Sequence, residues 1–491
     1  MQKEDGTSFL GSDDMNFTFN GQRKNYLSIL RGRKRPAWAI TRNLLTITGK
    51  PGSYLQDTVI QPRTIEVPVL IEGTDISNLQ KLKEDLASWL VTDEPKELIF
   101  DDEPDRIYFA VVDETFSPEE LAYSGTGTIK FVCPDPYKYG PEKEAIFPSD
   151  VVSLKDYNGT APGDPVFELE VLQPVTFAMI QNHLNEYTMI GKPIDVTDTP
   201  YTKYERVFYS DCDSLTGWTT AAPGEIDGNI AGTMQTNGTR FQASDYGTGS
   251  SWHGPAIKTS LPEVLTDFKM TAWIALYNGY AARQVGRVEI YLLDPNGNQV
   301  GKVAMKDTRT LQSLAWGEAR AGDADNYKYL INEYGDKPGN WNNFAGHVEL
   351  SREGNRWRAY FAMVDTSTGR HHTRRKVEWV DTENKFTRQV AQIVVHVGQF
   401  GSNEPISCGV YSISIFKINP NQSNKVPYIA DVGDIITFDH TTKDILINGE
   451  SRKDLKDFGA RFFELQKGEN QFVVLPSNSF AVRIRFRERF L

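Results

Sequence analysis

Short runs of β-branched and aromatic residues, separated by Gly, Pro and Asn, recur along almost the whole chain. Residues 64–71, 166–171 and 288–292 are examples, and each is alternating or continuous in apolar residues. Runs of this length that end at turn residues are typical of β-strands. A chain with this pattern does not fold as a helical bundle or a coiled coil. We therefore expect a mainly β protein.

One segment departs from the strand pattern. Its apolar residues recur at three- and four-residue spacing: Ile76, Leu79, Leu82, Leu86 and Leu90. This is the period of an amphipathic helix. Ser77 and Gln80 have the spacing of a capping box, and Pro95 ends the segment before the next strand. We expect a helix over residues 77–91 that packs on a sheet, which makes the first domain α+β.

Length and charge exclude several classes of protein. The 491 residues suffice for about three domains of roughly 150 residues each. The formal net charge is −12, without a long block of one sign, which argues against a sequence-specific nucleic-acid partner. No apolar run reaches the roughly 18 residues of a membrane helix, and residues 1–14 lack the apolar centre of a secretory signal. We therefore expect no membrane partner and synthesis in a cytoplasm.

Tryptophan marks a separate region in the second half of the chain. Seven of the nine tryptophans lie between Tyr204 and Lys417: Trp218, Trp252, Trp273, Trp316, Trp341, Trp357 and Trp379. A turn-rich segment at 158–165 precedes this region, and a polar loop at 419–424 follows it. Beyond the loop, residues 433–439 and 444–449 have the pattern of a hairpin. The Trp-rich region is therefore predicted to be a self-contained β domain.

The two ends of the chain carry motifs that occur together in one family. Phe-Thr-Phe-Asn-Gly at 17–21 opens the first block, and Cys-Pro-Asp-Pro-Tyr at 133–137 closes it. The last block contains Leu-Gln-Lys-Gly-Glu-Asn at 465–470. Together these blocks resemble the distal tail protein (Dit) family of long-tailed phages of Gram-positive bacteria. The Trp-rich region lies where larger members of that family carry an inserted carbohydrate-binding module.

The resemblance implies a domain order. Residues 1–14 are an added leader, and residues 15–140 form a ring-forming N-terminal domain. Residues 141–203 and 424–491 form a galectin-like β-sandwich, and residues 204–423 form an inserted jelly-roll domain. In some members the last strand, here residues 480–491, returns to the first domain, and both placements are open.

The resemblance also implies a function. Six copies would form a ring at the tail tip or baseplate of the virion, as a homohexamer. The ring would join the tail tube protein to the tail-tip protein, which carries the tail-associated lysin, and to receptor-binding or other baseplate proteins. The insert would bind host cell-wall saccharide during adsorption, without catalysis and without a cofactor. Two alternatives are a glycan hydrolase (depolymerase) acting on host cell-wall polysaccharide and a purely structural spacer.

Candidate residues for sugar recognition are Trp252, Trp316, Trp341 and Asn343. Flat aromatic rings cover the apolar face of a pyranose, and amides bind its hydroxyl groups. These residues lie in Gly- and Asn-rich segments, where side chains usually reach solvent. Trp273 and Trp357 lie in strand patterns instead, and we expect them in the core.

Two further groups have candidate roles. Asp211 and Asp213, near the start of the insert, have oxygen ligands suited to a structural Ca²⁺, although an ordinary turn is the more frequent reason for carboxylates at such positions. Near the C-terminus, four arginines alternate with other residues and share one strand face: Arg483, Arg485, Arg487 and Arg489. Like charges on one face repel one another, so we expect an intersubunit or interdomain contact with carboxylates. A solvated sheet face is the alternative.

Overall fold

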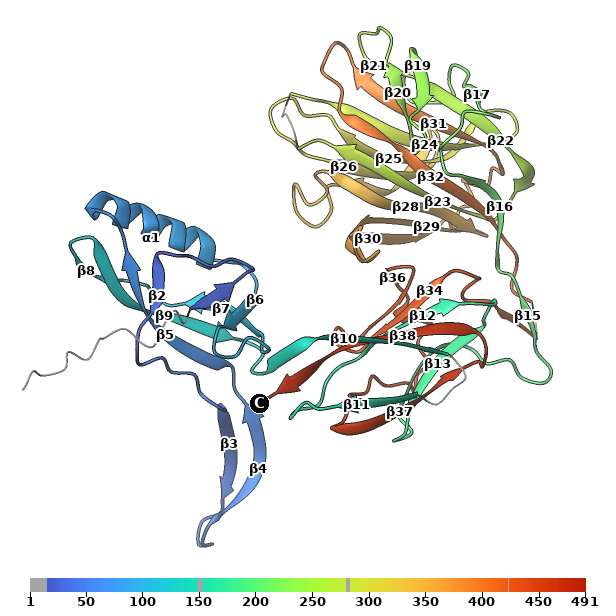
Figure 1. The fold of residues 1–491 in the computed structure, drawn as a ribbon. Coiled ribbons are helices and arrows are strands. Elements are labelled where there is room, and N and C mark those ends of the chain that lie inside the picture. Colours follow the sequence, from blue (N-terminus) through green and yellow to red (C-terminus); the bar gives the residue numbers. More distant parts are fainter. Residues whose placement is uncertain (1–15, 149–152, 280–282, 423) are drawn as a thin grey trace, which may run out of the picture.

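The computed structural model describes residues 16–148, 153–279, 283–422 and 424–491. Within these residues three large hydrophobic cores are present, each between or beneath its own sheets. We call the three parts the N-terminal domain (residues 16–137), the C-terminal sandwich (138–201 and 425–491) and the insert (204–418) (Figure 1). The expected leader, residues 1–14, lies outside the described residues. The expected mainly β fold with one helix is confirmed.

The N-terminal domain is one seven-stranded sheet with a helix on it. Its strands run in the order β1-β6-β7-β9-β5-β2, with β8 beside β9: β1 (Phe17–Phe19), β2 (Leu27–Ile29), β5 (Arg63–Glu72), β6 (Lys96–Phe100), β7 (Tyr108–Asp113), β8 (Glu119–Leu121) and β9 (Ser124–Cys133). Helix α1 (Ile76–Leu90) buries Leu79, Leu86 and Trp89 against this sheet.

The expected start of this helix is wrong by one residue. The helix begins at Ile76, and Asp75 caps it, because the Asp75 carboxylate accepts a hydrogen bond from the backbone N–H of Asn78 at 2.8 Å. An aspartate is as good an N-cap as a serine, and it lies at the point where the chain leaves the extended backbone of β5. The capping box of Ser77 and Gln80 is therefore not used.

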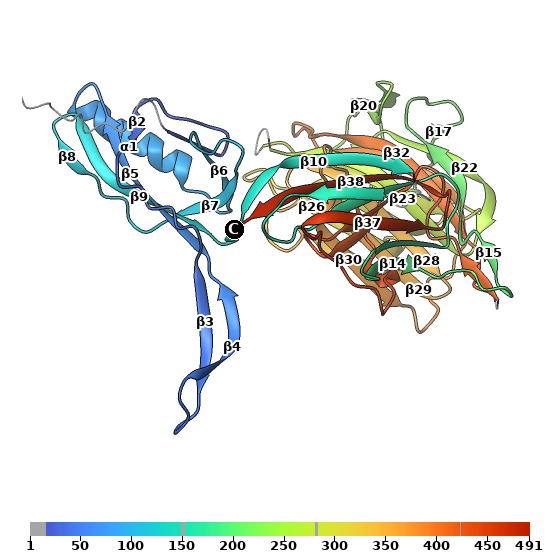
Figure 2. The ribbon, with the colours of Figure 1, turned by 60° about the horizontal axis from the view of Figure 1, so that its bottom comes forward.

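A long hairpin protrudes from the N-terminal domain. Strands β3 (Ile40–Thr46) and β4 (Ser53–Ile60) pair only with each other among the described residues, and the views in Figures 1 and 2 show them as an arm away from all three cores. Every residue of both strands is exposed. The exposed apolar side chains include Ile40, Leu44, Leu45, Tyr54, Leu55, Val59 and Ile60. An isolated two-stranded hairpin is only marginally stable in water, so this arm is suited to a partner.

The C-terminal sandwich packs two sheets around the second core. One sheet has the order β10-β38-β12-β34-β35-β36 and the other the order β11-β37-β13-β14. The bounds are β10 (Lys138–Pro148), β11 (Ser153–Tyr157), β12 (Val166–Val171), β13 (Phe177–Asn182), β14 (Tyr187–Gly191), β34 (Ile435–Asp439), β35 (Asp444–Ile447), β36 (Glu450–Ser451), β37 (Gly468–Leu475) and β38 (Phe480–Phe490), with a 3₁₀ turn at Lys453–Leu455. The last strand, β38, pairs with β10 and β12, so it lies in the sandwich and does not return to the N-terminal sheet.

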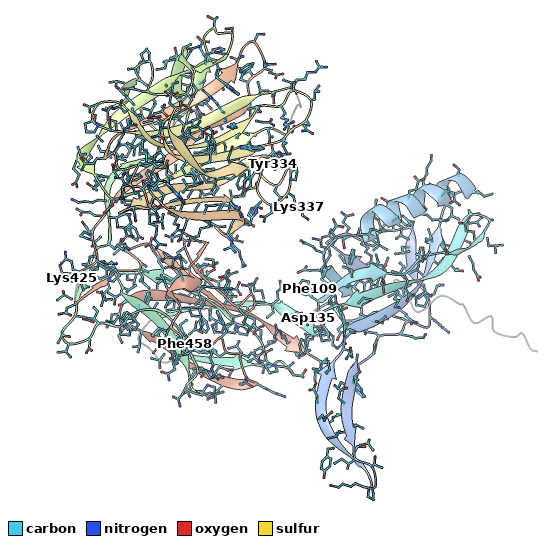
Figure 3. All side chains as sticks on the ribbon, turned by 180° about the vertical axis from the view of Figure 1, so that it is seen from behind. Phe109, Asp135, Tyr334, Lys337, Lys425 and Phe458 are labelled. Atoms are coloured by element: carbon cyan, nitrogen blue, oxygen red, sulfur yellow. The ribbon has the colours of Figure 1, made fainter. Side chains whose placement is uncertain are left out.

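The sandwich meets the N-terminal domain where β10 begins. The Phe109 ring lies 5.4 Å from the Tyr139 ring, and the Tyr139 hydroxyl donates to the Asp135 carboxylate. Figure 3 shows Phe109 and Asp135 at this junction. The guanidinium of Arg106 stacks 3.7 Å from the ring of Phe490 at the end of β38. Aromatic and cation–π contacts therefore join the two parts.

The insert is a larger sandwich whose core holds Trp357 and Trp341. Its front sheet has the order β19-β20-β32-β23-β28-β29-β30, with β16 beside β32, and its back sheet the order β17-β22-β31-β24-β25-β26-β27, with β18 and β21 beside it. The front strands are β16 (Tyr204–Ser210), β19 (Thr233–Thr236), β20 (Phe241–Asp245), β23 (Phe268–Tyr277), β28 (Phe344–Glu353), β29 (Arg356–Val364), β30 (His371–Val380) and β32 (Ser407–Ile418). The back strands are β17 (Thr219–Thr220), β18 (Asn229–Ile230), β21 (Trp252–Gly254), β22 (Ala256–Leu265), β24 (Gly286–Leu293), β25 (Gln299–Asp307), β26 (Trp316–Gly322), β27 (Tyr327–Glu333) and β31 (Val390–Phe400).

The chain enters and leaves the insert through a narrow stalk. Strands β15 (Thr199–Tyr201) and β33 (Lys425–Pro427) pair in parallel beside the sandwich (Figure 1). Entry and exit points that lie together on the surface allow one domain to be inserted into another. In the described part of the chain, no helix has the length and apolar character needed to cross a membrane.

Candidate functional site

An open cleft of about 460 Å³ hollows the outer face of the front sheet of the insert. It is lined by residues of β23, β28 and β32 and by one residue of the β29–β30 turn: Trp273, Tyr277, Ala345, Thr366, Tyr411 and Ser412. The three aromatic side chains are half-buried, so each ring keeps a face toward solvent. We call this surface the aromatic cleft.

Strand alternation places two of the aromatic rings on this face. Along β23, Met270, Ala272 and Ile274 point into the core. Trp273 and Tyr277 occupy intervening positions and therefore point to the outer face.

A β-bulge adds the third ring. Between β23 and β32, Trp273 pairs with Ser412 while the next residue, Ile274, pairs with Val410. Tyr411 is the extra residue at this shift, so Tyr411 and Ser412 both reach the outer face, and Val410 and Ile413 remain in the core. A bulge redirects side chains in this way and is frequent beside binding sites.

Polar groups lie beside the rings. The Arg240 guanidinium donates to the Tyr411 hydroxyl at 3.1 Å and to the Gln242 side-chain oxygen at 2.7 Å. Ser412 and Thr366 add hydroxyl groups to the lining. A flat apolar surface with hydrogen-bonding groups at its edge matches the apolar face and the equatorial hydroxyl groups of a pyranose.

The prediction that Trp273 is a core residue is wrong, and so is the prediction that Trp341 is exposed. Trp341 is fully buried, and its indole N–H donates to the Thr373 carbonyl at 2.9 Å. Its segment turns inward, because Gly317 and Gly335 leave room for the indole ring. A Gly- and Asn-rich segment therefore marks a turn here but not the direction of the aromatic side chain. Trp357 is buried as expected.

Asn343 is exposed but serves a neighbouring loop. Its side-chain oxygen accepts from the backbone N–H of Gly279 at 2.8 Å, and its φ of +55° is in the left-handed region that asparagine tolerates. These contacts give Asn343 a structural role in shaping the loop. It does not line the aromatic cleft.

Trp252 and Trp316 lie on the other side of the insert, on the back sheet. The Arg287 guanidinium is 4.7 Å from the Trp252 ring. The Trp316 indole donates to Asn332 at 2.6 Å, and its ring lies 4.6 Å from that of Tyr334, which Figure 3 shows at the edge of the insert that faces the N-terminal domain. Both tryptophans are half-buried. Neither belongs to the aromatic cleft, and a sugar-binding role for them stays a prediction.

The outer face of the back sheet carries a buried charge network. Its members come from β24, β25 and β26 and from the segment that covers them: Arg287, Glu289, Lys302, Glu318, Arg320 and Asp227. The Lys302 ammonium lies 2.9 Å from both Glu289 and Glu318 and 3.0 Å from Asp227. Residues 221–230 close over this face, where Ala221 and Ile226 pack on Tyr291 and Leu293.

This network bears on the hydrolase alternative, because Glu289 and Glu318 are two carboxylates that both contact Lys302. Burial acts to raise their pKa values, but the nearby Lys302 and, for Glu289, the Arg287 guanidinium hold the pKa of both below its usual value. A glycosidase acid needs a raised pKa, so that it carries a proton at neutral pH. Neither carboxyl group meets that requirement.

Asp211 and Asp213 form a turn near the start of the insert. The backbone N–H of Asp213 lies 3.5 Å from the Asp211 carboxylate, and the hydrogen bond to Asp211 raises the pKa of Asp213. Among the residues that the structure describes, no group of three or more His, Cys, Asp or Glu side chains is placed to hold a metal ion. A calcium site here stays a prediction that rests on two carboxylates.

The four arginines of β38 meet carboxylates of the same chain. Within the sandwich, Arg483 lies 3.5 Å from Glu144, Arg485 pairs with Glu168, and Arg489 lies 2.6 Å from Asp164. Arg487 lies 3.8 Å from Glu97 of the N-terminal domain, so one of the four makes an interdomain contact. An intersubunit role for these arginines stays a prediction.

Two regions of the chain match models of known protein families. Residues 22–133 match the phage tail protein RIFT-related domain, and residues 406–490 match the siphovirus-type tail component, C-terminal domain. Among characterised proteins, the distal tail protein of Bacillus phage SPP1 is 29% identical over 120 residues, which are 24% of this chain and 47% of that protein. The match thus spans about half the length of the relative.

A tail-component domain at each end, on either side of an inserted sandwich, defines a phage tail protein. The resemblance found in the sequence is confirmed by these matches. The chain is thus similar at both ends to tail-component domains, and in part to a distal tail protein (Dit).

Several solved structures are similar in part. The crystal structure of the SPP1 Dit protein is 21% identical and covers 37% of this chain and 75% of that chain, with a TM-score of 0.34. The CBM2 module of the evolved Dit of Lactobacillus casei BL23 phage J-1 is 17% identical and covers 45% and 98%, with a TM-score of 0.37. The laminarinase of Rhodothermus marinus is 9% identical and covers 44% and 98%, with a TM-score of 0.30.

Proposed function

We propose that this protein is the structural hub of a phage tail tip whose insert binds host cell-wall saccharide. As a homohexameric ring it joins the tail tube protein to the tail-tip protein and to receptor-binding or other baseplate proteins. It is made in the host cytoplasm and resides in the virion. The matches to tail-component domains at both ends of the chain support the hub, and the aromatic cleft supports the saccharide-binding role.

The hairpin of β3 and β4 supports the ring. An exposed strand pair with apolar side chains favours aggregation of a monomer. Contact with a second copy of the chain would cover these side chains. Leu44 and Leu55 are paired across the two strands and are 58% and 54% exposed. They are therefore suited to a contact between copies.

Analytical ultracentrifugation of the full chain tests the ring. We expect a species with six times the mass of one chain, and smaller species for the double variant Leu44→Ser with Leu55→Ser. Thr46→Ala, which removes only a hydroxyl pair with Ser53 at 2.8 Å, is the matched control and should leave the assembly unchanged. A wild-type protein that remains monomeric at all concentrations would contradict the ring.

Binding of the full chain to purified host cell-wall polysaccharide tests the saccharide role. We expect saturable binding that Trp273→Ala weakens by about tenfold or more, since a ring that stacks on a ligand is worth about 1–3 kcal/mol. Trp38→Ala, at a 70% exposed ring of the N-terminal domain, is the control and should bind as the wild type does. Absence of binding by the folded wild-type chain would favour the structural spacer instead.

The same samples test the hydrolase alternative. If the insert were a depolymerase, incubation with the polysaccharide would release reducing ends. We expect no release, and release of reducing ends by the wild-type chain would favour the depolymerase.

A further inference from the structure

One short turn connects the aromatic cleft to the C-terminal sandwich. Residues 365–370 join β29 to β30, and Thr366 of this turn lines the cleft. Four residues further on, Arg370 of the same turn lies 3.3 Å from Asp439 at the end of β34 in the C-terminal sandwich. The turn therefore contacts the aromatic cleft through Thr366 and the C-terminal sandwich through Arg370.

The turn is a rigid unit. The Asp365 carboxylate accepts from the backbone N–H groups of Ser367 and Thr368 at 2.8 and 3.2 Å. The backbone N–H of Gly369 donates to the Asp365 carbonyl at 2.7 Å, and that of Asp365 donates to the Arg370 carbonyl at 3.0 Å. A displacement at Arg370 is thus carried to Thr366, because few torsions between them are free.

Two further contacts between the insert and the C-terminal sandwich surround this turn. The backbone N–H of His371 donates to the Gly449 carbonyl at 3.2 Å, and Arg358 of β29 pairs with Glu450 of β36 at 2.6 Å. Gly449 has a φ of +81°, and a Cβ atom there would overlap the Gly369 carbonyl, so only glycine allows this approach. In Figure 1, β30 and β29 accordingly lie directly over β36.

Such a contact permits two states. Polar contacts between domains that are joined by a stalk leave relative motion of the domains as the default. The insert is held by these pairs, by Lys203 with Glu353 at 2.9 Å, and by the β15–β33 stalk. A docked and an undocked insert are then separated by a modest free energy.

We infer that the turn of residues 365–370 couples occupancy of the aromatic cleft to docking of the insert on the C-terminal sandwich. Docking fixes Arg370, the rigid turn then fixes Thr366 in the wall of the cleft, and the cleft holds its ligand more tightly. By linkage, a bound saccharide favours the docked state by the same factor. This inference rests on the proposed saccharide binding, and it gives the hub a signal that the host surface has been engaged.

The test uses the full chain with Glu450→Arg, which places a cation opposite Arg358. The matched control is Glu263→Arg, an equal charge reversal on β22 at a glutamate that pairs with Lys417 inside the insert at 2.7 Å. Gly449→Ala is a second variant, which acts by steric overlap rather than by charge. Far-UV circular dichroism confirms that each variant is folded.

Docking is read from energy transfer between dyes on cysteines introduced at Leu311 of the insert and Val196 of the sandwich, which are 93% and 100% exposed. The native thiols do not interfere, because Cys133, Cys212 and Cys408 are buried and free. Binding is read from the Kd for the same cell-wall polysaccharide.

We expect Glu450→Arg and Gly449→Ala to broaden the distance distribution and to weaken binding by about fivefold or more, the usual lower range of allosteric coupling. Glu263→Arg should change neither readout. A broadened distance with an unchanged Kd would overturn the coupling, and an unchanged distance would overturn the docking latch. If the wild type binds no polysaccharide, the saccharide role and the coupling fail together, while the distance readout still decides whether the insert is latched.

Discussion

The two outer faces of the insert belong to one sandwich and have opposite character. On the back sheet, charged side chains are covered by residues 221–230 and satisfy one another, with Lys302 at the centre. On the front sheet, Trp273, Tyr277 and Tyr411 remain open to solvent in the aromatic cleft. A face that the chain covers itself contributes to stability, and a face that it leaves open is available to a ligand. The presence of aromatic or charged residues on a sheet face does not by itself show whether that face is covered or open.

The largest effect should come from breaking the covered face. Lys302→Ala removes the cation shared by Asp227, Glu289 and Glu318, and it should lower the free energy of unfolding of the insert by about 3–5 kcal/mol, because buried carboxylates lose their partner. Denaturant unfolding followed by tryptophan fluorescence measures this, since seven of the nine tryptophans lie in the insert. Lys306→Ala, whose side chain is 24% exposed, is the control and should cost about 1 kcal/mol or less. Equal losses of unfolding free energy in the two variants would show that Lys302 is not the central cation of the network.

Mild acid should destabilise the insert by a smaller amount. His371, at the docked edge of the front sheet, is buried, and burial together with the nearby His347 lowers its pKa to about 4. The unfolded chain takes up this proton near pH 6.5, so the native state loses stability as the pH falls from about 6.5 to about 4, by on the order of 3 kcal/mol in total. Glu289 and Glu318 stay ionised for longer, because their pKa values lie below the usual one.

Unfolding free energies measured between pH 7 and pH 4 check this prediction. His371→Gln should flatten the pH dependence in that window. Part of the slope will remain, since burial also lowers the pKa of His396 and His440. An unchanged pH dependence of the unfolding free energy in the variant would mean that His371 does not contribute to the loss of stability in acid.

The smallest effect on stability should come from the open face. Trp273→Ala removes a half-buried ring, and we expect a loss of about 1 kcal/mol in unfolding free energy together with the loss of saccharide binding described above. Trp341→Ala is the comparison, because this ring is fully buried in the core and its removal should cost about 3–5 kcal/mol. Similar costs for the two tryptophans would place Trp273 in the core and remove the cleft as a binding site.

The fold class and the family resemblance could be predicted in part from the sequence, and the candidate binding site could not. The strand runs at 64–71, 166–171 and 288–292 and the helix around Leu79 are local patterns, and each is confirmed in β5, β12, β24 and α1. Among the candidate sugar-binding residues, Trp341 proved buried and Asn343 holds a loop, while Trp273, which lines the cleft, was assigned to the core. The signal that the sequence did offer was the alternation of Trp273 and Tyr277 with Met270, Ala272 and Ile274.

The sequence by itself determined the mainly β class, the single amphipathic helix and the resemblance to the Dit family, because residue periodicity and short motifs are properties of neighbours along the chain. Only the tertiary structure decided which tryptophans face solvent. The alternation of residues divides a strand into two faces. It does not indicate which of these faces is covered by another layer of the structure. The bulge at Tyr411 arises from pairing between β23 and β32, which are far apart in sequence, and the covering of Lys302 depends on residues 221–230 returning over the back sheet. Contacts of that kind are set by three-dimensional packing, and no local pattern encodes them.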